Sequence, residues 1–143
     1  MKTIINSLTV VLLLLLAVVS SAKDANSVPS EITWESLTGR HLYLTEFGAW
    51  KGGTKASSYY PSAANGNKDE RIVYNNNILM WLDAQDGDHY YIFHIDGRYI
   101  NILNTDGSVK NWLYLNDVYF DNGSLFLLTT DKYSIYRVFY VGK

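Results

Sequence analysis

The sequence predicts an all-β protein, an antiparallel up-and-down meander of about eight strands, and three observations support this. Aromatic residues make up 15% of the chain and 12 of them are tyrosine, and large aromatic side chains suit the pleated surface of a sheet. From Arg40 onward, many segments alternate with a period of two, which is the period of a strand. Asp-Gly and Asn-Gly dipeptides separate these segments, as they do in tight hairpins.

The first residues predict the compartment. Lys2 precedes an unbroken apolar run from Val10 to Val19, and small side chains follow at Ser20, Ser21 and Ala22. The run is too short to cross a bilayer comfortably and has no charged stop-transfer flank, so a cleaved signal peptide is favoured over a transmembrane helix. We therefore expect a secreted or periplasmic protein with no membrane span, cleaved near Ala22.

Removal of the first 22 of 143 residues leaves 121, which is the length of one domain. Residues 23 to 33 are polar and predict an N-terminal tail, and residues 34 to 143 predict a single β domain. The chain has no cysteine, which excludes disulfides and thiol chemistry. The chain has 12 basic and 14 acidic residues, and Lys2 would be removed with the signal peptide. The mature chain would therefore have 11 basic and 14 acidic residues, a net charge of about −3. These charges form no basic stripe, and we expect no nucleic-acid partner.

The mature chain opens with a short element and a first strand. A turn of helix is expected over Thr33 to Leu37, where Trp34 and Leu37 share a face and can plug one end of the sheet; irregular chain around a buried Trp34 is the alternative. The first strand is expected over 40 to 48. Its alternation places two sets on opposite faces: His41, Tyr43, Thr45 and Phe47 on one, and Leu42 and Leu44 on the other.

A long segment and a regular meander follow. Residues 49 to 69 have no sustained pattern, and such a long connection is typically a functional lid or binding loop or a disordered segment. Trp50, Tyr59 and Tyr60 favour a packed loop. Strands are then expected near 71–75, 78–84, 88–96, 98–104, 110–120, 124–130 and 133–141. Their turns are expected at Asp86-Gly87, Asp96-Gly97, Asp106-Gly107 and Asn122-Gly123.

Several strands are apolar on both faces. Tyr91, Phe93 and Ile95 oppose Tyr90 and Ile92 on one of them. On the last strand, Ile135, Phe139 and Val141 oppose Tyr136, Val138 and Tyr140. A sheet with one solvated face would alternate more cleanly, so we expect the long loop, a second sheet or a partner to cover part of the outer face.

The layout resembles a known family. It has the opening Leu37-Thr38-Gly39-Arg40-His41-Leu42-Tyr43-Leu44, a long first loop, hairpins on Asp-Gly, and the closing Tyr133-Ser134-Ile135-Tyr136-Arg137. Over residues 32 to 141 this resembles the small secreted bacterial lipocalin-like domains of the calycin group. The resemblance implies a barrel of eight strands with a cup for a small apolar ligand, and a β-sandwich is the alternative.

One motif departs from that family. Lipocalins carry Gly-x-Trp at the start of the first strand, and a late arginine lies over the tryptophan. The matching triplet is Gly39-Arg40-His41, so the ring is a histidine, while Arg137 matches the late arginine. The resemblance therefore implies that Arg137 faces His41, where a protonated imidazole would make a poor cation–π partner.

No constellation of residues predicts catalysis, a metal or a cofactor. His89 and His94 are five apart on one strand and so lie on opposite faces, and no spacing brings His41 to them. Asp83, Asp86 and Asp88 lack the ligand pattern of an EF-hand loop. Glu35, Glu46 and Glu70 are carboxylates without a specific pairing, and no Gly-x-Ser-x-Gly elbow is present. We expect no enzyme activity.

The aromatic side chains are the strongest functional hint, because flat rings with polar tips offer contact area at little entropic cost. Core packing is the alternative for each of them. We expect a non-enzymatic binding protein that holds a small apolar or amphipathic molecule in the barrel, with residues 49 to 69 over its mouth. The alternatives are a glycan- or protein-binding module, such as an adhesin or inhibitor, and a homodimer through an outer apolar face. The candidate binding residues are Tyr43, Phe47, Trp50, Tyr59, Tyr60, Trp81, Tyr91, Tyr99, Trp112 and Tyr114.

Overall fold

The protein is a closed β-barrel. The computed structural model describes residues 32–61, 70–83 and 86–142. Its elements are a short 3-10 helix η1 (Glu35–Leu37) and strands β1 (Leu42–Lys51), β2 (Thr54–Lys55), β3 (Arg71–Tyr74), β4 (Leu79–Leu82), β5 (His89–Asp96), β6 (Tyr99–Leu103), β7 (Val109–Asp121), β8 (Ser124–Asp131) and β9 (Ile135–Val141). Within these ranges, no helix is long and apolar enough to cross a membrane.

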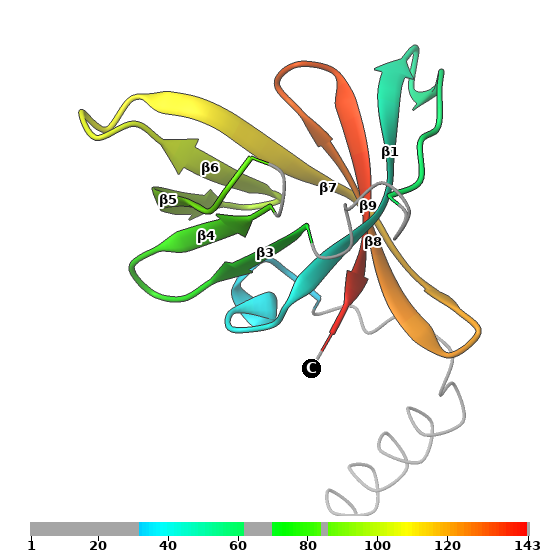
Figure 1. The fold of residues 1–143 in the computed structure, drawn as a ribbon, viewed down its shortest axis with the longest axis horizontal. Coiled ribbons are helices and arrows are strands. Elements are labelled where there is room, and N and C mark those ends of the chain that lie inside the picture. The colour runs from blue at the N-terminus through cyan, green and yellow to red at the C-terminus, as the bar shows by residue number, and fades with distance from the viewer. Residues whose placement is uncertain (1–31, 62–69, 84–85, 143) are drawn as a thin grey trace, which may run out of the picture.

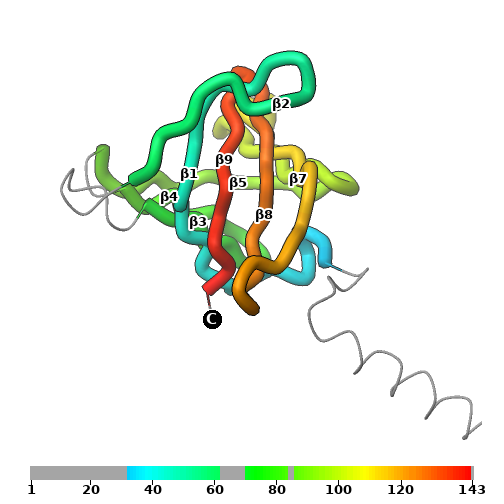
Figure 2. The backbone as a smooth tube through the Cα atoms, turned by 90° about the vertical axis from the view of Figure 1, so that its right-hand side faces the viewer, coloured from blue at the N-terminus to red at the C-terminus, as the bar shows by residue number. Residues whose placement is uncertain are grey.

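Eight strands form the barrel in chain order, and β2 is an additional short strand paired only with β1. All pairings are antiparallel, and β1 closes the ring because it pairs with β3 on one side and β9 on the other. In Figure 1, β3 to β6 form one side of the barrel and β7, β8, β9 and β1 the other. Figure 2 shows β1, β9, β8 and β7 side by side in front of β3, β4 and β5. The predicted up-and-down meander is confirmed.

The turns explain why the strands reverse where they do. Asn122 and Gly123 both have positive φ, 50° and 78°, between the paired ends Asp121 and Ser124. That is the backbone of the two-residue turn that asparagine-glycine favours. Between β5 and β6, Gly97 alone has positive φ, 57°, at the first position of a two-residue turn. Three of the four predicted dipeptides lie between consecutive strands, whereas Asp96 ends β5 and the turn there is Gly97-Arg98.

The closed end of the barrel is plugged by η1. Trp34 and Leu37 are each 1% exposed, and the Trp34 indole N–H donates to the backbone oxygen of Arg98 at 2.7 Å. The Tyr74 hydroxyl donates to the backbone oxygen of Trp34. The prediction of a short helical turn with these two residues on one face is confirmed.

Side chains fill the barrel above this plug. Inward-facing leucine, isoleucine, valine, tyrosine and phenylalanine side chains from seven of the eight barrel strands pack into one buried cluster around Trp34 and Leu37, and β5 adds partly buried ones. The cluster comprises Leu42, Leu44, Ile72, Tyr74, Leu79, Ile100, Ile102, Leu113, Leu115, Leu127, Phe139 and Val141, with Tyr91, Phe93 and Ile95 of β5 packed against it. The half of the barrel interior next to Trp34 is therefore filled by a hydrophobic core.

The first strand differs from its prediction in its facing and in its bounds. A β-bulge between Leu44 and Glu46 inserts one residue, so the alternation reverses along the rest of β1. Phe47 consequently pairs with Arg137 and faces the interior, although simple alternation placed it on the face of Tyr43. The strand also runs to Lys51, so residues 49 to 51 are strand, and β2 lies within the expected loop.

The first part of the expected loop covers the outer face of β9. Main-chain hydrogen bonds join Phe47 to Tyr59 and Ala49 to Ala56, so residues 50 to 60 fold back along β1. Gly48 permits this close approach, because a Cβ at this position would lie 2.1 Å from the Ser57 carbonyl oxygen. Tyr136, which points outward from β9, is buried beneath this segment. Of the expected loop, residues 62 to 69 lie outside the described ranges.

Candidate functional site

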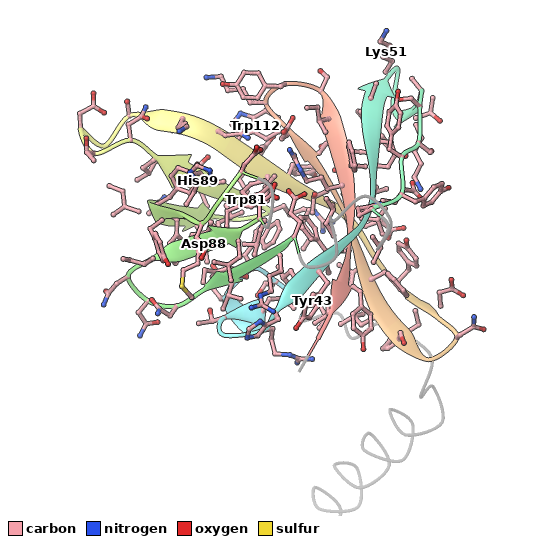
Figure 3. The ribbon with its side chains drawn as sticks, in the orientation of Figure 1. Tyr43, Lys51, Trp81, Asp88, His89 and Trp112 are labelled. Carbon is pink, nitrogen blue, oxygen red and sulfur yellow. The ribbon has the colours of Figure 1, made fainter. Side chains whose placement is uncertain are left out.

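The open end of the barrel, opposite Trp34, holds the candidate site. A cavity of about 90 Å³ lies there, lined by Trp81, Tyr91, Ile102, Lys110, Asn111 and Tyr133. These residues come from the ends or beginnings of β4, β5, β6 and β7 and from the β8–β9 turn. Figure 3 shows Trp81 in the space between β4 and β9, inside the ring of strands. We call this set, with the neighbouring Glu70, Asp131 and Arg137, the open-end site.

An ion pair forms one wall of the open-end site. The Asp131 side chain is 1% exposed, and its Oδ2 accepts a 2.7 Å hydrogen bond from Arg137 Nη1. The other oxygen, Oδ1, accepts hydrogen bonds from the backbone N–H groups of Tyr133 and Ile135 at 2.9 and 3.0 Å. One carboxylate thus fixes both the turn that carries Tyr133 and the position of Arg137.

Arg137 in turn lies against Trp81. Its guanidinium carbon is 4.9 Å from the centre of the indole ring, a cation–π contact. The contact expected with His41 is not formed. Phe47 is the β1 partner of Arg137, whereas His41 lies beside Gly142 at the other end of the same strand pair. The late arginine therefore does cover a tryptophan, but one on β4.

A second carboxyl group holds the other edge of the same indole. The Trp81 indole N–H donates to Glu70 Oε1 at 2.9 Å. Burial raises the pKa of Glu70 above 4.5; the charges of Asp83 and Asp86 act in the same direction, and the Trp81 hydrogen bond and Arg137 oppose them. The net shift is upward, so the folded protein favours the neutral carboxyl relative to the unfolded chain.

This shift predicts how the Glu70→Gln variant depends on pH. Because the pKa of Glu70 is raised in the folded state, ionisation of this carboxyl destabilises the fold. The free energy of unfolding therefore falls as the pH rises from below 4.5 through the folded-state pKa. The glutamine oxygen still accepts from Trp81 and carries no charge. We expect Glu70→Gln to raise the melting temperature relative to wild type at about pH 7.5 and to change it little at about pH 3.5. An equal difference at both pH values would contradict the assignment.

A second cation–π contact joins two residues that line the cavity. Lys110 Nζ lies 4.9 Å from the centre of the Tyr91 ring. Both residues also line a groove of about 360 Å³ on the outer face of β5 and β6, together with Ile78, Tyr90, Ile92 and Leu103.

The structure brings together only part of the predicted site. Trp81 and Tyr91 line the cavity, and Phe47 faces inward and stacks on Tyr59 at 5.5 Å. Tyr60 is exposed, and Trp50 packs against Tyr136 on the outer face. Tyr99, Trp112 and Tyr114 form a separate ring cluster outside β6 and β7, where their neighbours Ile100 and Leu113 point inward. Tyr43 lies outside β1, well apart from Trp81 in Figure 3.

Sequence reasoning missed the polar half of the site. Glu70, Lys110, Asp131 and Arg137 were not among the candidate binding residues, and neither was Tyr133. Asp131 had a usable signal, since an aspartate followed by Lys-Tyr-Ser between two apolar segments is typical of a side chain that caps its own turn. Among the described residues, no three His, Asp or Glu side chains gather as a metal site requires.

The comparisons with known proteins add no relative. No family model, curated protein or solved structure matches the chain significantly. The barrel itself, with eight antiparallel strands closed in chain order, is consistent with a lipocalin-like fold.

Proposed function

We propose that the protein is an exported, non-enzymatic binding protein that holds a small amphipathic molecule at the open end of its barrel. The observation that carries this proposal is the composition of the open-end site. Aromatic rings of Trp81, Tyr91 and Tyr133 line one cavity together with Lys110 and Asn111. Mostly apolar walls with a few placed polar groups are typical of small-molecule sites.

The size and charge of the site favour an amphipathic ligand over a wholly apolar one. A cavity of about 90 Å³ is well below the roughly 300 Å³ or more that encloses a drug-sized ligand. Only one end of such a ligand would enter, and the rest would lie over the rim. Lys110 and Asn111 line the cavity, and the Asp131–Arg137 pair and Glu70 lie directly behind its Tyr133 and Trp81 walls, so a ligand group with hydrogen-bonding capacity fits better than a hydrocarbon chain.

The proposal includes the compartment and the family. We propose that residues 1 to 22 are a signal peptide cleaved near Ala22 and that the barrel is a secreted or periplasmic domain of the lipocalin-like group. The plugged end, the filled lower core and the polar rim support a carrier that binds at one end only.

A binding assay tests the proposal. The protein recovered after export is titrated with fatty acids, bile salts, retinol and an anilinonaphthalene sulfonate dye, and tryptophan emission and melting temperature are followed. We expect at least one amphipathic member to quench emission and raise the melting temperature. Tyr133→Ala, at a residue 62% exposed on the rim, should weaken that ligand by about tenfold, which is 1.4 kcal/mol.

The matched control is Tyr60→Ala, at a residue 65% exposed on the segment outside the barrel. It should leave the affinity unchanged. If no member of the panel changes either signal, or if Tyr133→Ala binds as tightly as wild type, the open-end site does not have this role.

A further inference from the structure

The outer surface of β4, β5 and β6 is apolar and exposed. Five large apolar side chains on these strands or directly beside them are exposed to solvent: Ile78, Tyr90, Ile92, Tyr99 and Val109. Three of them line the groove of about 360 Å³ on this side of the barrel. In Figure 1 these strands lie on the side of the barrel away from β9 and β1. We call the surface formed by these five residues and their outward-facing neighbours the β4–β6 face.

Strand pairing joins these residues into one continuous surface. Met80 of β4 pairs with Tyr90 of β5, and Ile92 of β5 pairs with Leu103 of β6. Leu103 pairs in turn with Val109 at the start of β7. The ring cluster outside β6 and β7 described above extends the same surface. The β4–β6 face therefore spans four neighbouring strands.

The centre of the β4–β6 face carries almost no charge. The outward-facing positions of β5 and β6 are Tyr90, Ile92, His94, Asp96, Tyr99, Asn101 and Leu103. Of these seven residues, only Asp96, the last residue of β5, is an aspartate, glutamate, lysine or arginine. Depletion of charged residues together with exposed aromatic rings is typical of the centre of a subunit interface. Two copies that meet through this face bring no like charges together at its centre.

The closed barrel determines how a second copy can pack. Because β1 pairs with both β3 and β9, every barrel strand already has a neighbour on each side. No barrel edge is therefore left for a strand of another chain to extend. Two sheets can instead pack face to face at a distance of about 10 Å, with the outward side chains of each filling the space between them.

The area of the face is that of a subunit contact. Its five exposed apolar members show 39% to 60% of their surface. At about 150–250 Å² for a large side chain, they expose about 400–500 Å², as much as the largest apolar patch of a typical monomer. Half-buried neighbours and polar residues at the rim, among them Asn104 and Lys110, bring the face to about 800 Å², the area that each partner of a stable complex buries.

A membrane surface and a small molecule fit the face less well. Among the described residues that line the groove, Lys110 is the one cation, and the adjoining turn carries Asp106. Proteins that lie on a membrane surface have several cations beside their apolar residues. A small molecule in the groove would leave Tyr99 and the rings beside it uncovered, because they do not line the groove.

We propose that the β4–β6 face is the contact of a two-fold homodimer, in which it packs against the same face of a second copy of this chain. In a two-fold contact both copies use the same residues. The groove of each copy is the hollow, and the exposed Tyr90 and Ile92 of the other copy are the side chains that fill it. The proposal does not depend on the function of the open-end site.

Analytical ultracentrifugation of the protein over a range of concentrations tests this proposal. We expect the wild-type protein to sediment with twice the mass of one chain. Ile92→Asp places two unpaired carboxylates in the contact, one from each copy, and should raise the dissociation constant of the dimer by about 100-fold or more. Ile92→Val keeps the surface apolar and should remain a dimer. The matched control is Tyr60→Asp, at an exposed residue outside this face, and it should also remain a dimer.

A mixed sample of isotope-labelled and unlabelled wild-type protein gives a readout that needs no variant. Nuclear Overhauser effects between the two copies should involve the methyl groups of Ile92 and the ring of Tyr90. The proposal is overturned if the wild-type protein is a monomer at every concentration, if Ile92→Asp dimerises as tightly as wild type while circular dichroism shows it folded, or if the contacts between copies involve only other surfaces.

Discussion

Replacement of Trp34 by alanine is expected to lower the free energy of unfolding by about 3–5 kcal/mol, the range measured when a buried tryptophan or phenylalanine is truncated. Trp34 is 1% exposed and forms the floor of the barrel core. Its removal opens a cavity and leaves the Arg98 carbonyl without the 2.7 Å hydrogen bond that the indole donates. Urea unfolding monitored by circular dichroism measures the change.

Two further variants separate packing from hydrogen bonding at the plug. Trp34→Phe keeps most of the ring but loses the N–H, so it should cost about 1–3 kcal/mol, which is less than Trp34→Ala costs. Trp112→Ala, the same truncation at a half-buried ring on the outer surface, should have a clearly smaller effect than Trp34→Ala. A Trp34→Ala variant as stable as Trp112→Ala would show that η1 does not close the barrel.

Replacement of Asp131 by alanine is expected to cost a similar amount, about 3–5 kcal/mol, for a different reason. The change removes the acceptor of three hydrogen bonds and leaves the Arg137 guanidinium, which is largely buried, without its counter-charge. Removal of one partner of a buried ion pair destabilises a protein by far more than the intact pair stabilises it, because an uncompensated buried charge remains. Thermal and urea unfolding report the loss.

The partner variants show which part of the interaction matters. Asp131→Asn keeps an oxygen for the two backbone N–H groups and should cost less than Asp131→Ala. In the Asp131→Ala Arg137→Met double variant no unpaired charge remains, so its loss should be smaller than the sum of the two single losses. Asp121→Ala, at the exposed end of β7, should change stability by no more than about 0.5 kcal/mol. Strict additivity of the double variant would contradict the buried pair.

Local signals in the sequence were sufficient to predict the eight barrel strands and the hairpins between them, but not the short β2, which lies within the expected loop. Positive-φ turns at Gly97 and Asn122-Gly123 fixed the hairpins, and alternation along 88–96 correctly separated Tyr91 and Phe93 from Tyr90 and Ile92. The helical spacing of Trp34 and Leu37 was enough to predict the plug. These features depend on residues close together in the chain.

Features that depend on distant residues were not predictable. The bulge after Leu44 reverses the face of Phe47, and nothing in the local pattern marks it. Arg137 contacts Trp81, which is 56 positions away in the chain. Closure of the barrel brings these two residues together, and not Arg137 and His41 as expected. The ring contacts between Tyr119, Phe126, Tyr140 and Tyr43 likewise exist only because four separate strands align these residues in register.

The most direct test of the open-end site is chemical-shift mapping of the protein during titration with dodecanoate, an amphipathic probe. If the rim and cavity hold the ligand, the amide signals of Trp81, Asn111 and Tyr133 move together and saturate, while those of Trp34 and Gly39 at the plugged end stay in place. Saturable shifts confined to other surfaces, or none at the rim, would contradict binding at the open end of the barrel.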